Sequence, residues 1–246
     1  MIDRKSDREH VAWDIETTGF GVTDSLTVVG FWFPDGHAVL LLNVYSEEWA
    51  DAEELESQID DATEGVDVTV RVCEGGTAML QGIREVMYER FENNHNRLVA
   101  YNAESWNGGF DLPFLRTHCI ACSVPWVFDG LQFADLYDPL KKRLNTTVTD
   151  YSTSADANTL TGSHELLTPT KALSEPLADT IPEDHSWYVH QHYDPFESSA
   201  SAAYAYRKQL YLDVLLHNLA DIHRTWELGE LLREYVPGKD ISTKKL

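Results

Sequence analysis

Two carboxylates near the N-terminus are the first residues whose type and spacing could do chemistry. Asp14 and Glu16 follow an apolar run and stand two positions apart, so on a strand their side chains emerge on the same face. Two such acids repel each other and lose solvation unless a cation compensates them. Oxygen ligands of this kind suit Mg²⁺ or Mn²⁺. A divalent-metal site is one interpretation, and a solvated strand edge is the other.

Further acidic residues of interest stand much later in the chain. Asp111 follows a Gly-Gly-Phe loop at the point where a helix is expected to begin, and an ordinary helix N-cap aspartate would explain it equally well. His217 and Asp221 are four residues apart on an expected helix and therefore share a face. There Asp221 could complete a metal site while His217 acts as a base for water. A surface pair at this spacing is the alternative.

Taken together and in this order, these segments resemble the DEDD superfamily of 3′→5′ exonucleases, which has a ribonuclease H-like fold. They are most similar to the proofreading exonuclease domain of family B DNA polymerases. The first family motif, Asp-x-Glu-Thr, is matched by residues 14–17, and the second by Tyr101-Asn102 and residues 110–115. The third motif is matched by His217, Asp221, Thr225 and Leu228. The resemblance runs from about residue 10 to residue 230.

The sequence departs from the family pattern at two places. The loop between Asn102 and Phe110 is longer than in the polymerases, so Asn107, which is closer to Phe110, is a second candidate for contact with the substrate. The residue before the last aspartate is His217 instead of the usual tyrosine. Histidine is the base in the other DEDD branch, but there four residues separate it from the aspartate, whereas three do so here.

The resemblance implies hydrolysis of phosphodiester bonds by two Mg²⁺ or Mn²⁺ ions. Asp14 would bridge both ions, Glu16 and Asp221 would hold the water-activating ion, and Asp111 would hold the other. His217 would orient or deprotonate the attacking water, because an imidazole pKa near 6.5 suits this task at neutral pH.

The substrate implied by the resemblance is single-stranded nucleic acid, with DNA favoured over RNA. Its binding should depend on stacking with aromatic side chains and on local basic residues. Trp106 and Phe114 are either stacking platforms or core residues, and Arg224 either meets a phosphate or pairs with a neighbouring acid. The substrate-binding residues that we expect are Thr17, Asn102, Asn107 and Phe110.

The elements that must position these residues follow from the apolar pattern. Runs of β-forming residues bounded by turn residues predict three strands joined as an antiparallel meander, over 10–17, 26–33 and 37–44. Apolar residues at helical spacing predict helices over 77–91, 110–122, 160–167 and almost all of 200–235. Further strands are expected within 97–102 and 127–136.

This order of elements predicts an α/β fold with a mixed sheet flanked by helices. With the resemblance, we expect a ribonuclease H-like mixed five-stranded sheet. We also expect a single exonuclease domain over residues 1–246, with loop insertions at 46–76 and 168–198. His190 and His192 in the second insertion could bind a transition metal, although a polar exposed loop explains them better.

The net charge of −22 is unusual for a nucleic-acid enzyme, which ordinarily has a basic surface. A halophilic source, a haloarchaeon or one of its viruses, would resolve the conflict, because molar salt reduces the Debye length to about 3 Å. Acidic surfaces also keep such proteins soluble. The alternative is a protein that avoids nucleic acids. We favour the halophile because of the motifs.

The remaining expectations concern location and partners. No stretch approaches the roughly 18 apolar residues of a membrane span, and the N-terminus lacks the apolar run of a secretory signal. We therefore expect a cytoplasmic, stand-alone 3′-5′ exodeoxyribonuclease, with a polymerase or repair factor as a candidate partner and none in the membrane. The alternatives are an exoribonuclease of the same fold and an inactive regulatory module associated with nucleic acid.

Overall fold

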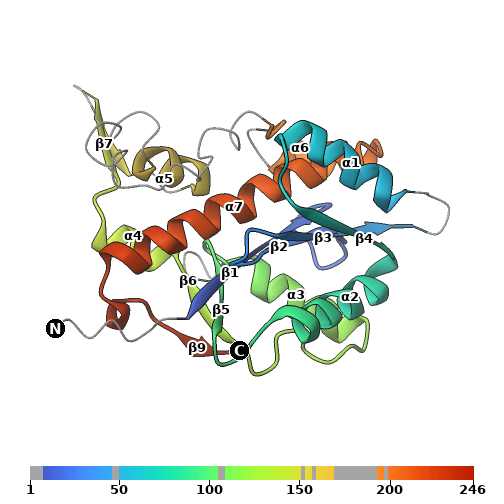
Figure 1. Cartoon of the computed structure of the whole chain (residues 1–246), viewed down its shortest axis with the longest axis horizontal. Coiled ribbons are helices and arrows are strands. Elements are labelled where there is room, and N and C mark those ends of the chain that lie inside the picture. The colour runs from blue at the N-terminus through green and yellow to red at the C-terminus, as the bar shows by residue number, and fades with distance from the viewer. Residues whose placement is uncertain are drawn as a thin grey trace.

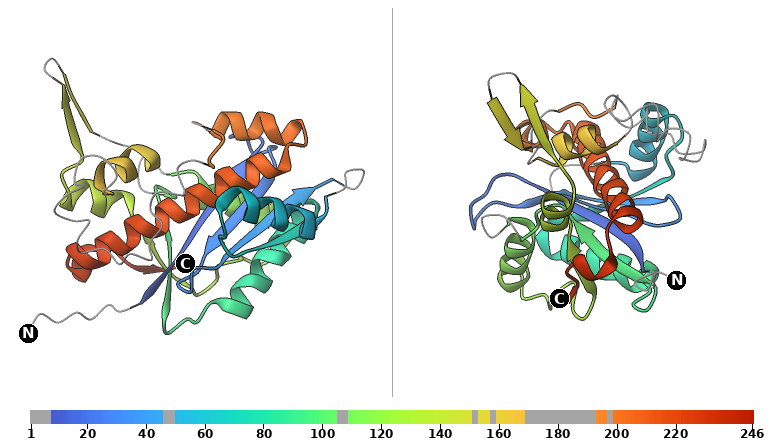
Figure 2. Two further views of the ribbon diagram at one scale, coloured as in Figure 1. Left: turned by 45° about the horizontal axis from the view of Figure 1, so that its top comes forward. Right: turned by 90° about the vertical axis from the view of Figure 1, so that its left-hand side faces the viewer.

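The computed structural model describes residues 8–45, 50–104, 109–150, 153–156, 159–168, 193–196 and 199–246. It is an α/β structure in which helices flank a mixed sheet of seven strands (Figure 1). The strands of this sheet are β1 (Glu9–Thr17), β2 (Leu26–Trp32), β3 (Ala38–Val44), β4 (Val68–Glu74), β5 (Asn96–Ala100), β6 (Gln132–Asp135) and β9 (Lys244–Lys245). A separate hairpin, β7 (Thr147–Asp150) and β8 (Thr153–Asp156), projects from the body of the molecule (Figure 2).

The strand order across the main sheet is β4-β3-β2-β1-β5-β6-β9. Strand β2 is antiparallel to both β1 and β3, which confirms the expected meander. Strands β5 and β6 run parallel to β1. Because parallel strands end at the same edge of a sheet, the carboxyl ends of β1, β5 and β6 meet there. These ends carry Glu16, Asn102 and Asp135.

Helices cover both faces of the sheet (Figures 1 and 2). The long helix α7 crosses one face, where its apolar side packs on β1 and β2, and α2 and α3 cover the other. The helices are α1 (Ala52–Thr63), α2 (Gly75–Arg90), α3 (Asp111–Ala121), α4 (Tyr137–Arg143), α5 (Leu160–Leu167), α6 (Ser199–Arg207), α7 (Tyr211–Tyr235) and the short 3₁₀ helix η3 (Gly238–Asp240).

Strand β1 has apolar residues on both faces in its first half. Val11, Trp13 and Ile15 face the core formed with α2 and α3, whereas Ala12 belongs to the core beneath α7. Side chains alternate along a strand, so Asp14 and Glu16 continue the row of Ala12 toward α7. The strand pattern thus directs both carboxylates to the face that α7 covers.

The structure corrects two expectations about the sheet and the first insertion. The sheet has seven strands instead of five, because β4 and β9 extend its two edges. Residues 46–76 are not an irregular insertion, since α1 and β4 lie within them. Acidic residues conceal the pattern of α1, which buries Leu55 and Ile59 one turn apart and is capped by Asp51. Strand β9 is two lysines long and has no apolar pattern to reveal it.

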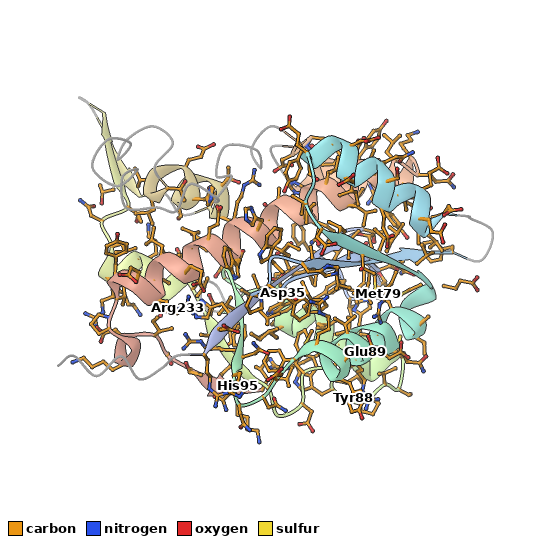
Figure 3. The ribbon with its side chains drawn as sticks, in the orientation of Figure 1. Asp35, Met79, Tyr88, Glu89, His95 and Arg233 are labelled. Atoms are coloured by element: carbon orange, nitrogen blue, oxygen red, sulfur yellow. The ribbon has the colours of Figure 1, made fainter. Side chains whose placement is uncertain are left out.

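The second expected insertion, 168–198, lies mostly outside the described residues, as do His190 and His192. Its described part includes Tyr193, which is buried in the core beneath α7. On the opposite side of the sheet, α2 buries Met79 and exposes Tyr88 (Figure 3). Among the helices described, none combines the length and the apolar character needed to cross a membrane.

Candidate metal centre

The centre of the site is the row of carboxylates that β1 presents to α7. Glu16 is buried and Asp14 keeps slight exposure. Asn218 of α7 donates a hydrogen bond from Nδ2 to Asp14 Oδ2, at 3.1 Å. Helix α7 can approach this closely because β2 has Gly30 beside it, where a Cβ atom would lie 2.0 Å from Asn218 Oδ1. The glycine therefore sets the distance between the strand and the helix at the site.

Helix α7 contributes the second half of the site. His217 and Asp221 share a face of the helix, as their spacing predicted. His217 Nε2 lies 3.9 Å from Glu16 Oε1 and 3.8 Å from Asp221 Oδ2. The ligand atoms of Glu16, His217 and Asp221 all lie within 4.8 Å of one another, close enough to hold one metal ion. The expectation of a solvated strand edge is therefore wrong for Glu16.

Asp111 reaches the same site from the first turn of α3. Its charge is the largest single electrostatic influence on Asp14 and also acts on Glu16. Gly109 permits the turn that precedes the helix, because its φ is +62° and a Cβ there would lie 2.1 Å from the backbone of Glu104. Gly109 thus has a structural reason that does not depend on any ligand.

The carboxyl groups of Asp14, Glu16 and Asp111 have raised pKa values, so they ionise less readily than usual. Burial, followed by the charges of Asp111, Glu16 and Asp221, raises the pKa of Asp14 well above its ordinary value. Burial, followed by the charges of Asp221, Asp111 and Asp194, raises the pKa of Glu16 as well. Burial, with the charges of Asp135 and Asp221, raises the pKa of Asp111 to about 7. Each carboxylate destabilises the ionised form of the others.

These residues fit one or more divalent cations. Within the described ranges, no lysine or arginine forms an ion pair with Asp14, Glu16 or Asp111. His217 Nε2 is buried, has no hydrogen-bond partner and faces the gap between Glu16 and Asp221. Buried carboxylates are ordinarily paired or bound to a metal. A cation bound to oxygen ligands would compensate the repulsion that raises the pKa of these groups.

Arg224 and Asp194 form an ion pair beside the site. No motif in the sequence indicated Asp194. Arg224 lies 2.8 Å from Asp221 Oδ1 and 2.6 Å from Asp194 Oδ2. Of the two alternatives for Arg224, pairing with neighbouring acids is therefore the one found. The other oxygen of Asp194 lies 2.8 Å from His217 Nδ1. Asp194 and His217 are 23 positions apart in the sequence, so no periodic pattern could reveal this contact.

Burial and pairing act in opposite directions on these groups. Burial alone would raise the pKa of Asp194, but the hydrogen bond from His217 and the charge of Arg224 outweigh it and lower that pKa. Burial alone would lower the pKa of His217, but the hydrogen bond to Asp194 and the nearby charges of Asp221, Asp194 and Asp14 raise it. Asp194 is thus ionised at neutral pH and accepts the hydrogen bond.

Two of the expected substrate-binding residues, Thr17 and Asn102, lie at the carboxyl ends of β1 and β5. Thr17 stands at an irregularity in the pairing of β1 and donates from Oγ1 to the carbonyl of Gly19. Asn102 adopts a left-handed conformation with φ of 60°, and its backbone N–H donates to Asp135 Oδ1. Asn107 and Trp106 lie outside the described residues. Asp135, which the motifs did not indicate, therefore anchors the turn that carries Asn102.

A row of aromatic rings adjoins the site between the end of β1 and the start of α3. Phe110 is half-buried and packs edge-on against Phe20, with ring centroids 5.1 Å apart. Phe114 continues the row at 4.9 Å from Phe110, and His118 stacks on Phe114. Phe114 is buried, so core packing accounts for it, whereas Phe20 is 82% exposed. Phe20 belongs to none of the motifs in the sequence.

Other acidic candidates lie elsewhere. Asp213, which lies on α7 eight residues before Asp221, lines a hollow beside α1 with Asp51 and Leu55. No protein-family model matches this chain, and the comparison with curated proteins finds no significant match.

Proposed function

We propose that this protein is a metal-dependent 3′→5′ exonuclease that hydrolyses single-stranded DNA. The observation that carries the proposal is the grouping of Glu16, His217 and Asp221 within ligand distance of one another, with Asp14 and Asp111 close enough for their charges to act on this group. The three segments that supply them are separated by about 100 residues each. Three motifs meeting in space are better explained by shared chemistry than by three independent structural roles.

The order of the elements supports the ribonuclease H-like part of the proposal. Three antiparallel strands, then further strands parallel to β1 with helices between them, lead to a long helix on the sheet. The order of elements predicted a mixed sheet flanked by helices, and the ribonuclease H-like fold was expected from the resemblance of the motifs. The two additional edge strands, β4 and β9, lie at the outer edges of the sheet, away from β1 at its centre. They therefore leave the arrangement around the carboxylates unchanged.

The four carboxylates would hold two Mg²⁺ or Mn²⁺ ions, which neutralise charge on the scissile phosphate and activate water when bound. Arg224 fixes one oxygen of Asp221 and leaves the other facing His217. Asn218 holds Asp14 in the same way. These two contacts keep the carboxylates in place, so that little reorganisation is needed during the reaction.

His217 would orient or deprotonate the attacking water through Nε2. Its Nδ1 is occupied by Asp194, and its Nε2 is directed between Glu16 and Asp221. A single basic atom facing the carboxylate pair suits a water that approaches the phosphate from this side. His217 thus takes the role that tyrosine has in the polymerase family.

The test is hydrolysis of labelled oligonucleotides in molar KCl with Mg²⁺ or Mn²⁺. Single-stranded DNA labelled at the 3′ end should release mononucleotides at once, whereas the same strand labelled at the 5′ end should shorten progressively. Asp14→Asn should abolish release, since one of the metal-binding carboxylates is lost. RNA and duplex DNA serve as comparison substrates.

Each outcome decides between the alternatives. Preferential cleavage of RNA would replace the DNA substrate by RNA and leave the mechanism in place. No metal-dependent release from DNA or RNA would contradict the exonuclease and favour an inactive module. Release that is unaffected by Asp14→Asn would indicate a contaminating nuclease, so the wild-type activity would then not count as support.

A further inference from the structure

The contacts of Asp194 extend beyond the four carboxylates and the histidine of the proposed function. Its side chain is 5% exposed and lies against the face of α7 that carries His217 and Arg224. Both carboxylate oxygens are used, one by His217 Nδ1 at 2.8 Å and the other by Arg224 at 2.6 Å. Because each oxygen is bound by a different partner, the buried carboxylate is fixed in one orientation.

The partner of His217 determines which ring nitrogen is available. A carboxylate accepts hydrogen bonds and does not donate them, so Nδ1 of His217 carries a hydrogen. In the neutral ring, Nε2 then has the free lone pair. That atom is buried, lacks a hydrogen-bond partner and faces the gap between Glu16 and Asp221.

The ring plane is fixed by a second contact from the same segment. Phe196 packs edge-on against His217, with ring centroids 5.6 Å apart. Residues 193–196 thus contact the histidine through both Asp194 and Phe196. Carboxylates that hold the remote nitrogen of a functional histidine are a recurring means of fixing its tautomer and orientation.

We infer that Asp194 is a positioning residue for catalysis, which holds His217 in the Nδ1–H form so that Nε2 presents its lone pair to the reaction site. The inference rests on the proposed function for its catalytic consequence, although the orientation of His217 is a property of the resting protein. Asp194 does not touch the reacting atoms itself, and it acts through His217.

The kinetic test is a double-mutant cycle of Asp194→Asn and His217→Ala. The asparagine keeps the size of the side chain but loses its charge, and its amide can turn a donor toward Nδ1. Asp194→Asn alone should lower kcat about 10- to 100-fold and leave KM for single-stranded DNA unchanged. In the His217→Ala background the same change should have little further effect, because the group on which Asp194 acts is gone.

A matched control is Glu230→Gln. Glu230 lies on α7, 3.3 Å from the buried His10, outside the candidate site. The variant Glu230→Gln loses a carboxylate–histidine contact of the same kind, and we expect its kcat to be unchanged. If Asp194→Asn lowers kcat equally in the His217→Ala background, Asp194 acts through Arg224 and Asp221 or through the fold, and the inference is overturned.

The second test does not depend on activity. Nitrogen-15 spectra of the histidine rings in the metal-free protein, recorded at a pH high enough to leave His217 neutral, should show its ring in the Nδ1–H form, with its signals identified by their absence in His217→Ala. Asp194→Asn should convert part of the population to the other tautomer. An unchanged His217 spectrum would overturn the inference. If the wild type shows no nuclease activity, the proposed function fails, while this spectrum still decides how His217 is held.

Discussion

Asp111 combines a position at the start of a helix with strong electrostatic repulsion. The positive end of the α3 dipole favours its ionised form. Burial and the charges of Asp135 and Asp221 nevertheless raise its pKa to about 7. The native protein therefore binds a proton at Asp111 that the unfolded chain, with a pKa of about 4, has already released. This carboxyl is a source of instability until a cation compensates it.

Stability of the metal-free protein should respond to pH through Asp111. Because its pKa is raised on folding, the free energy of unfolding falls as pH increases from about 4 to about 7 and then levels off. Asp111→Asn removes this penalty and should stabilise the protein at pH 8 by about 1–2 kcal/mol, an increase of a few °C in Tm. The gain should vanish near pH 4. Thermal unfolding in EDTA across this range measures it.

The control for this measurement is Asp35→Asn. Asp35 is exposed and pairs with Arg90, and an exposed pair of this kind contributes little to stability. Its loss should not increase Tm at pH 8. Mg²⁺ or Mn²⁺ should raise Tm of the wild type more than that of Asp111→Asn. Equal pH dependence in the wild type and Asp111→Asn would contradict the raised pKa.

At the scale of elements, the contact between β2 and α7 determines how the site is assembled. Gly30→Ala would place a Cβ atom 2.0 Å from Asn218 Oδ1 and 3.1 Å from Ile222 Cδ1. Overpacking of this kind costs about 1–3 kcal/mol, and it would move Asn218 away from Asp14. In the Asn218→Ala background the shortest contact is absent, so Gly30→Ala should cost less. Denaturant unfolding of the four proteins in molar KCl measures the difference.

A glycine in ordinary surroundings provides the comparison for Gly30. Gly76 lies in α2, where a Cβ would come no closer than 3.5 Å to Cys122 Sγ, so Gly76→Ala should leave the protein as stable or more stable. Additive effects of Gly30→Ala and Asn218→Ala would show that the two residues are not in contact, and would contradict this packing.

The loop after β1 should contribute to substrate binding through Phe20. Its ring is exposed and continues the row of Phe110 and Phe114 at the start of α3, where Asp111 follows Phe110. Stacking of a base on an aromatic ring contributes about 1–3 kcal/mol, so Phe20→Ala should raise KM for single-stranded DNA about tenfold and change kcat little. Tyr88→Ala, which removes an equally exposed ring from α2 (Figure 3), should leave both constants unchanged. An unchanged KM in Phe20→Ala would exclude this stacking site.

Local patterns predicted those elements whose own residues bury an apolar face. The helix expected over 160–167 is α5 with the same bounds, and the three strands of the meander lie within a residue or two of their expected limits. Two-residue spacing placed Asp14 and Glu16 on one face of β1, and four-residue spacing placed His217 and Asp221 on one face of α7. The resemblance of the motifs, and not the spacing, indicated that Glu16, His217 and Asp221 lie together, as they do in the structure. Asp194 and Asn218 could not be assigned in this way, since their roles depend on contacts between segments distant in sequence.

At the scale of the whole molecule, the acidic surface has few basic groups to compensate it. The chain has 41 acidic and 19 basic side chains. Several of the basic groups form exposed pairs, such as Lys142 with Asp138 and Arg71 with Glu89, which contribute little to stability. The excess of carboxylates therefore repels both its own neighbours and any polyanion. A nucleic-acid substrate must overcome this repulsion before it reaches the site.

Salt should therefore change substrate affinity in the opposite sense to that of a basic nucleic-acid-binding protein. Salt ordinarily weakens binding to nucleic acid. Contacts from lysine and arginine release counterions from the phosphates, and this release is less favourable when the solution is already concentrated in salt. Here, screening of the −22 charge shortens the Debye length from about 10 Å at 0.1 M to about 3 Å at 1 M. We expect KM for single-stranded DNA to fall over this range of KCl at a fixed Mn²⁺ concentration.

An oligonucleotide with uncharged methylphosphonate linkages, except at its 3′-terminal phosphodiester, should show a much smaller response, since it lacks the repelled charges. If KM rises with KCl for the ordinary strand, a local basic surface governs binding and the overall charge does not.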